Sequence, residues 1–333
     1  MWKPTEEHKN LLRQTASPDV NVAYAAQQKI AKAIELPLRQ GIQPGDIIGD
    51  IFEEVPADGL STIEFPLDLL TPGTESDFAA FTVPSFGAIP QRHVQSDYVN
   101  VPVYYIANAI DWDVRYARNA RWDVVSRATE VFQKGFIKKQ NDDGWHCLTA
   151  AAFNRNIIVA DSDSAAGVFS VRLVSLAKLV MGRNGGGNST SVNNFRATDL
   201  FISLESEADI RSWNVDQVDE ITRREIFTTP EGTLNRIFSV NLHALHELGE
   251  GQEYNTYFVT TLGGTLPTAG NAKLEVAFAM DLSKKGSFVK PIGETLQVYP
   301  DDSKLRSLQR GIFGTMAHGY AALDSRQILA VAI

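Results

Sequence analysis

Apolar residues recur at intervals of three and four over two stretches of the chain, which is the spacing of one buried helix face. The first stretch, residues 114–152, is only partly apolar, and arginine, lysine, glutamate and glutamine fill many of the other positions. We therefore predict a long helix with one polar face, interrupted at Gly135 and at residues 141–144. The second stretch, residues 169–184, is predicted to form a shorter helix.

A narrower apolar stripe lies near the N-terminus. Residues 17–19, Ser-Pro-Asp, are typical of a helix start, because proline is tolerated in the first turn. The helix is predicted to end at Pro37, and its apolar stripe consists of Val22, Ala26, Ile30 and Ile34. Because so thin a stripe buries little surface by itself, we expect a projecting N-terminal arm.

Alternating apolar and β-branched residues predict strands over residues 46–55, 61–70 and 97–110. In the third strand one face is predicted to carry Val99, Val101, Val103 and Tyr105. A buried strand is expected over residues 199–204, followed by a helix that carries Ile210 and Trp213, and further strand patterns with turns fill residues 226–297. Two short strands are predicted at the end of the chain. Because helices and strands do not alternate as βαβ units, the predicted fold class is α+β.

The segment between the second and third strands, residues 71–96, contains three prolines and two glycines, so no helix or long regular strand can run through it. Its large apolar residues are Phe78, Phe81, Val83, Phe86 and Ile89. A purely solvated loop would leave these side chains in water. Two interpretations are therefore open: the segment folds back on its own domain, or it is a long hairpin whose apolar tip is covered by another copy of the chain.

Composition limits the class of protein. The chain has 333 residues, of which 44% are hydrophobic, so it can bury a sizeable core in one domain or in two or three lobes. A net charge of -9 argues against a surface that grips nucleic acid throughout, because neutralising phosphates requires clustered lysine and arginine. The single cysteine, Cys147, excludes an internal disulfide and indicates a reducing compartment. The polar N-terminus and the absence of an apolar run of about 18 residues predict a soluble protein that is not exported and has no membrane partner.

The motifs that carry enzyme chemistry are weak. The glycine-rich residues 182–191 lack the lysine of a phosphate-binding loop and follow a predicted helix instead of a strand, so we expect a surface loop. His146 and Cys147 are neighbours on a helix and diverge by about 100°, which favours a core cysteine over a catalytic thiol. We predict no catalytic residue and no cofactor.

One group of residues supports an alternative of another class. If residues 243–250 are helical, His243, His246 and Glu250 share a face and could hold a divalent metal, as in a metal-dependent hydrolase. Their spacing differs from that of the zinc motifs HExxH and HxxEH.

The order of the predicted elements resembles that of the major capsid proteins of tailed bacteriophages, the Hong Kong 97 type fold. The resemblance rests on the hairpin at residues 56–110, on NARWDVVSRATEVFQKGF after it, on ATDLFISLESEADIRSW in the middle, and on the ending GYAALDSRQILAVAI. It implies an N-terminal arm (1–50), an extended loop with the start of a peripheral domain (51–112), a spine helix with peripheral domain (113–153), an axial domain with returning peripheral strands (154–310) and C-terminal peripheral strands (311–333).

The same resemblance implies a structural protein that is not an enzyme. Hexamers and pentamers of the chain would form an icosahedral shell around double-stranded phage DNA, in the virion and, during assembly, in the host cytoplasm. The implied partners are other copies of the chain, a separate scaffolding protein, a cement protein and a portal protein, and the DNA is enclosed without sequence-specific binding. An encapsulin, a bacterial protein shell of similar fold, is the other assembly protein that the chain resembles.

The resemblance also directs attention to subunit contacts. We expect these at Phe78, Phe81 and Phe86 of the extended loop and at Ile30 and Ile34 of the arm. Burying each phenylalanine contributes about 1.5 to 3 kcal/mol toward the cost of ordering the loop. Some family members cross-link their shells through a lysine in this loop, but this chain has no lysine between Lys32 and Lys134, so we expect a noncovalent shell.

Overall fold

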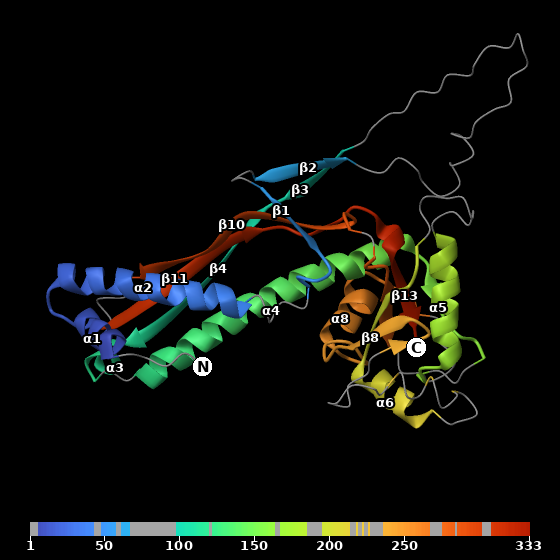
Figure 1. Cartoon of the computed structure of the whole chain (residues 1–333), viewed down its shortest axis with the longest axis horizontal. Coiled ribbons are helices and arrows are strands. Elements are labelled where there is room, and N and C mark those ends of the chain that lie inside the picture. The colour runs from blue at the N-terminus through green and yellow to red at the C-terminus, as the bar shows by residue number, and fades with distance from the viewer. Residues whose placement is uncertain are drawn as a thin grey trace, which may run out of the picture. The chain divides into compact units, whose positions relative to one another are not determined.

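The structure of the chain is a computed structural model (Figure 1). It describes residues 6–42, 48–57, 61–66, 98–119, 122–163, 167–184, 195–213, 218, 222, 226, 236–266, 275–283, 285–301 and 308–333. The chain divides into two compact units. The first unit comprises Met1–Glu64, Asn100–Gly144 and Val289–Ala321, and the second comprises Phe65–Val99, Trp145–Phe288 and Ala322–Ile333.

The first unit is built on the sheet β1-β10-β11-β4, to which β12 is added by pairing with β10, and a two-stranded ribbon is formed by β2 and β3. The strands of the sheet and the ribbon are β1 (Glu53–Pro56), β2 (Thr62–Pro66), β3 (Tyr98–Pro102), β4 (Tyr104–Asp113), β10 (Phe288–Asp301), β11 (Gln309–His318) and β12 (Ala321–Ala322). Its helices are α1 (Glu6–Thr15), α2 (Val20–Ile42), α3 (Val114–Arg118) and most of α4 (Trp122–Arg155). None of the helices in the described ranges has the length and apolar character needed to cross a membrane.

Helices α1, α2 and α4 pack on one face of the sheet. The core between them contains Leu12 of α1, Ile34 of α2, Phe132 of α4 and Leu296 of β10, all at most 3% exposed. The approach is close at Gly314 of β11, where an added Cβ would lie 2.7 Å from Cζ of Phe132. Glycine therefore lets the helix side chains reach the sheet backbone.

Helix α2 differs from the predicted arm. Pro37 lies inside the helix, which continues to Ile42, although proline removes one backbone hydrogen bond. Tertiary contacts hold the last turns: Leu38 is 2% exposed, and Nε of Arg39 donates to the carbonyl oxygen of Leu296 at 2.8 Å. The buried stripe is broader than predicted and consists of Ala23, Ala26, Gln27, Ile30, Ala31, Ile34 and Leu38. Helix α2 is thus part of the core of the first unit.

Helix α4 runs without interruption over 34 residues, contrary to the breaks predicted at Gly135 and at residues 141–144. Both glycines permit close packing instead. A Cβ at Gly135 would lie 2.7 Å from Nδ2 of Asn108, and a Cβ at Gly144 would lie 2.4 Å from Cδ1 of Ile48. The polar residues between them include Lys139 and Asp143, which form an ion pair one turn apart at 2.7 Å.

The predicted strand over residues 97–110 is divided in two at Val103, whose N–H donates to the carbonyl of Ser61 at 2.8 Å. The division changes the side-chain alternation. Val101 is 1% exposed, but Tyr105 is 68% exposed, so the prediction that they share one face is wrong.

The second unit contains a six-stranded sheet in the order β5-β13-β9-β6-β8-β7. Its strands are β5 (Ile158–Val159), β6 (Asp199–Ile202), β7 (Arg236–Ile237), β8 (Val240–Ala244), β9 (Val276–Met280) and β13 (Ile328–Ala332). Its helices are α5 (Val171–Asn184), α6 (Leu204–Ser212), α8 (Glu253–Thr256), the π-helical turn η3 (Tyr257–Thr261) and the 3-10 turn η5 (Ser325–Gln327), together with the end of α4.

The centre of this sheet agrees with the sequence-based expectations. Strands β6, β9 and β13 are buried at every position, as their continuous apolar runs predict. Helix α6 follows β6 directly, and the hydroxyl of Ser203 caps it by accepting from the N–H of Ser206 at 3.0 Å. The α+β fold class is confirmed.

The glycine contacts of α4 lead to a stability prediction. Gly144→Ala should lower the free energy of unfolding by about 1 to 3 kcal/mol, because the new Cβ overlaps the side chain of Ile48, which is fully buried and would have to shift within the core. Helix propensity alone predicts the opposite sign, about 1 kcal/mol in favour of alanine. The matched control is Gly182→Ala in α5, where no atom lies within 4 Å of the new Cβ, and this variant should be as stable as the unmodified chain or more stable. Urea unfolding of both variants checks the sign, and equal stability of the two would contradict the packing argument.

Candidate subunit interface

The sheet of the first unit has two different faces. Every second residue of β4 packs against the helices, and the residues between them are exposed. The register partners of these exposed residues on β11 and β10 lie in a row with them on the same face of the sheet. We define the outer sheet face as this row, which consists of Tyr105, Ala107, Ala109, Phe313, Thr315, Gln297 and Tyr299. Among these, Tyr105 is 68% exposed and Tyr299 is 41% exposed.

Aromatic rings give this face its chemistry. The rings of Tyr299 and Phe313 stack with centroids 5.3 Å apart, and the hydroxyl of Tyr105 donates to Oε1 of Glu294 at 3.3 Å. Tyrosine combines a large apolar surface with a polar tip, and it is enriched in the buried parts of protein interfaces. The outer sheet face is therefore a candidate surface for protein contacts.

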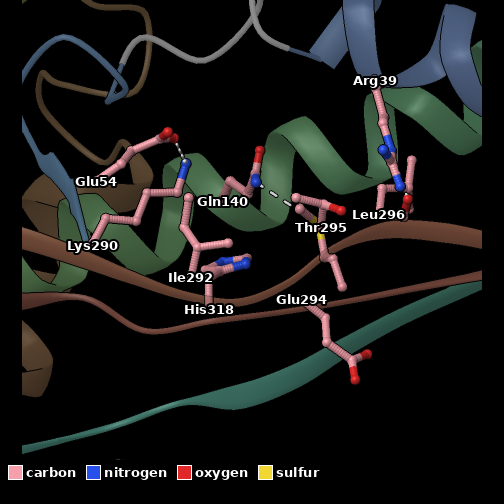
Figure 2. Close-up of a pocket in the computed structure, with 10 residues that line it drawn as sticks. Arg39, Glu54, Gln140, Lys290, Ile292, Glu294, Thr295, Leu296 and His318 are labelled. Atoms are coloured by element: carbon pink, nitrogen blue, oxygen red, sulfur yellow. Dashed lines mark hydrogen bonds and ion pairs between the residues drawn. The ribbon is translucent and has the colours of Figure 1, made fainter. Parts of the chain in front are cut away.

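Behind the opposite face lies a small pocket of about 160 Å³, between α2, α4 and strands β1, β10 and β11 (Figure 2). Its charged centre is Lys290, which is 4% exposed and whose Nζ lies 3.5 Å from Oε1 of Glu54. Glu54 and Lys290 are register partners on the parallel strands β1 and β10, so the ion pair lies across the two strands. In Figure 2 the Glu294 carboxylate extends away from this centre. The pocket thus contains a structural ion pair that helps to hold β1 in the sheet.

A second buried polar contact joins α2 to the sheet. Nη1 of Arg310 on β11 donates to Oε1 of Gln27 at 3.1 Å, and the two residues are 4% and 0% exposed. Removing one partner of such a buried contact typically costs more than the contact contributes, because the other partner stays desolvated. The contact therefore favours one register of α2 on the sheet.

The predicted interface residues fall into two groups. Phe78, Phe81 and Phe86 lie outside the described residues. Ile30 and Ile34 are 2% and 3% exposed and pack in the core of the first unit, so their apolar character is accounted for within the chain itself. The exposed large apolar residues of α2 are Val20, Val22 and Tyr24, between 42% and 56% exposed.

The alternative metal site is not formed in the described part of the chain. Residues 240–244 form strand β8, so the helical face expected for His243, His246 and Glu250 does not exist, and no group of three potential ligands occurs among the residues with described positions. Nε2 of His243 instead contacts Oδ1 of Asp199 at 2.8 Å. Burial by itself would raise the pKa of Asp199, but hydrogen bonds from His243, Thr198 and Asn241 together outweigh it, and the pKa lies below its ordinary value.

Cys147, predicted to be a core cysteine, is a free cysteine that is partly buried. Burial raises the pKa of its thiol to about 11, so the reactive thiolate is disfavoured at neutral pH. A role in the interior is consistent with this value.

Sequence reasoning missed the outer sheet face. Tyr299 and Phe313 lie on strands far apart in the sequence, and only the pairing of β10 with β11 brings their rings together. The sequence does show the alternation of side chains around Tyr105. It places Tyr105 on the same face as Val101, however, because it does not reveal that the strand is divided at Val103.

Comparison with protein-family models and with curated proteins gives no match. Solved structures do match. The chain is similar to one from Microbacterium phage Oxtober96, with 12% identity and a TM-score of 0.57 over 86% of this chain and 90% of that chain. It is similar to the Cyanophage Pam1 capsid asymmetric unit, with 13% identity and a TM-score of 0.57 over 85% and 88% of the two chains. It is also similar to the capsid of Cyanophage P-SCSP1u, with 11% identity and a TM-score of 0.58 over 86% of this chain and 88% of that chain. The likeness establishes the fold, and the predicted Hong Kong 97 type is confirmed.

The position of α2 in the core generates a prediction. Ile34→Ala should lower the free energy of unfolding by about 2 to 5 kcal/mol, because it leaves a cavity in the core cluster that also contains Phe132 and Leu296. Val22→Ala on the same helix is the control and should change it by less than about 0.5 kcal/mol, because Val22 is 44% exposed. Thermal and urea unfolding of the isolated chain measure both effects. A small effect of Ile34→Ala in the isolated chain would mean that α2 packs stably only in an assembly.

Proposed function

We propose that this chain, which has the fold of phage capsid subunits, is a major capsid protein that assembles into an icosahedral shell around double-stranded DNA. The observation that carries the proposal is the extent of the match, which covers 85–86% of this chain and 88–90% of the matched chains. A structural role, without catalysis, is part of the same proposal, because the solved structures that match are those of phage capsids.

The described surfaces suit a subunit of a shell. A closed lattice requires each subunit to present several contact patches, each of which can be weak, because closure makes their effects cooperative. The outer sheet face, with Tyr105 and Tyr299, is one such patch, and the exposed residues Val20, Val22 and Tyr24 of α2 are another. Hexamers and pentamers are the rings that an icosahedral lattice of one chain type uses.

The extended loop is proposed to supply a third contact. Phe78, Phe81 and Phe86 would be buried on an adjacent subunit, and burial of each contributes about 1.5 to 3 kcal/mol. Since residues 33–133 contain no lysine, a lysine cross-link from this loop is excluded, and the shell would be stabilised by noncovalent contacts and by a cement protein.

The remaining partners follow from the same role. A scaffolding protein would guide assembly in the host cytoplasm, and a portal protein would occupy one vertex of the virion shell. The net charge of -9 suits a container that encloses DNA without binding it tightly or by sequence.

Electron microscopy of the purified chain, alone and after expression with the neighbouring genes, tests the assembly. Rings of five or six subunits, tubes or closed shells are expected. The matched control is the same preparation in about 1 M salt, which screens contacts between charged residues. The yield of particles should then change, but their size and shape should stay the same. A uniform monomer under every condition would rule out the shell.

The loop contact has its own test. Phe81→Asp should leave the monomer folded, as judged by circular dichroism and its melting temperature, but should abolish stable shells, because a carboxylate would have to be buried at the contact. Phe81→Leu keeps an apolar side chain and should assemble. Normal shells from Phe81→Asp would show that Phe81 makes no subunit contact.

A further inference from the structure

Strand β4 forms one edge of the sheet in the first unit and pairs with β11 alone in that sheet. The pairing is antiparallel and continuous over ten residue pairs, from Tyr104 with His318 to Asp113 with Gln309, without a bulge. The other side of the strand is therefore a long and regular row of backbone groups.

The hydrogen-bond pattern shows which groups form this row. The N–H of Val114 donates to the carbonyl of Leu308 at 3.0 Å, next to the last pair of the ladder. Since hydrogen-bonded and non-bonded pairs alternate in an antiparallel ladder, the even-numbered residues of β4 exchange hydrogen bonds with β11. The backbone groups of the odd-numbered residues Tyr105, Ala107 and Ala109 point away from β11, to the open side.

Within the described residues, no other backbone group bonds to these three residues on that side. One of them has a local partner, because the N–H of Ala109 donates to Oδ1 of Asn108 at 2.9 Å. The N–H groups of Tyr105 and Ala107 and the three carbonyl groups remain oriented outward. The side chains of the same residues lie on the outer sheet face, so backbone and side chains offer one continuous surface.

The edges of the sheet in the second unit are different. It ends in β5 and β7, which have two residues each. Very short edge strands, bulges, prolines and charged side chains are the usual means of preventing edge pairing. Residues 104–110 of β4 contain no proline and no charged residue, and the strand has no bulge. Of the edges described here, β4 alone has the features of a template for another strand.

We infer that the open edge of β4 pairs with an extended strand of a second copy of this chain, so that a backbone ladder crosses the subunit boundary. The inference rests on the proposed function, since a shell supplies a second copy at a fixed position. The partner strand that fits is β4 itself, antiparallel about a two-fold axis, because an isologous contact satisfies the same row on both copies.

Charge favours the same arrangement. Asp111 and Asp113 both lie at the C-terminal end of β4. Antiparallel pairing centred near the middle of the strand places the acidic end of one copy opposite the neutral end of the other. Parallel pairing would bring like charges together, which is destabilising.

Hydrogen exchange at residue resolution, on assembled particles and on free subunits, tests the inference directly. On assembly, the amides of Tyr105 and Ala107 should exchange more slowly by about tenfold or more, because they gain hydrogen bonds. The amides of Ile106 and Asn108, which already bond to β11, serve as the internal reference and should change much less. Particles in which Tyr105 and Ala107 exchange as fast as in free subunits would overturn the inference and leave the shell intact as a proposal. Failure to form any particle would overturn both.

A pair of substitutions at Ala107 gives a second test. Ala107→Pro removes an outward N–H but no bond to β11, and proline is tolerated on edge strands in that orientation. The variant should remain a folded subunit and lose assembly by about tenfold or more in particle yield, because a hydrogen bond at the boundary is lost on both copies. Ala107→Ser keeps the N–H with a side chain of similar size and should assemble normally. Normal particles from Ala107→Pro would contradict strand pairing at this edge. If Ala107→Pro does not fold, the exchange measurement on the unmodified chain decides.

Discussion

The packing of helices α2 and α4 on only one face of the β10-β11-β4 sheet is the constraint on which much of the first unit depends. The helices approach so closely that Gly314 has no room for a side chain beside Phe132. The packing of the two helices on the sheet depends on glycine at position 314 of the strand and on a continuous helix α4 opposite it. It also buries Ile34 and Leu38 of α2. The alternate residues of the sheet, Tyr105 and Tyr299 among them, are not covered by any helix in the described part of the chain. A folded core and an open surface therefore follow from the same alternation of side chains.

Much of the second unit can be predicted from the sequence, because its signals are local. The apolar residues 200–202 lie in a fully buried strand, and the hydroxyl of Ser203 caps the next helix by accepting from the N–H of Ser206, three residues away. Helix α5 likewise follows from its apolar spacing. In these places propensity, pattern and capping indicate the same element, which is the condition under which sequence reasoning succeeds.

The errors occur where distant residues decide the outcome. Gly135 and Pro37 are helix breakers by intrinsic preference, yet both lie inside helices. Gly135 lies close to Asn108 on strand β4, and the turns after Pro37 are held by the bond from Arg39 to Leu296, 257 residues away. Such partners leave no periodic pattern in the chain. The candidate interface was missed for the same reason, because the stacking of Tyr299 on Phe313 exists only once the strands are paired.

An open strand edge has different consequences in a free subunit and in a closed assembly. For a free protein, a long edge is a hazard, because it can pair with any extended chain. In a closed lattice the partner and its orientation are fixed, so the same row of N–H and C=O groups contributes to one defined contact. The net charge of -9 on each subunit opposes unspecific association. A single weak ladder is then insufficient to hold two free subunits together, whereas several contacts acting together around a closed ring are sufficient. In the proposed shell, the open edge of β4 would therefore take part in one defined contact, whereas the two-residue edge strands β5 and β7 of the second unit's sheet offer little backbone for pairing.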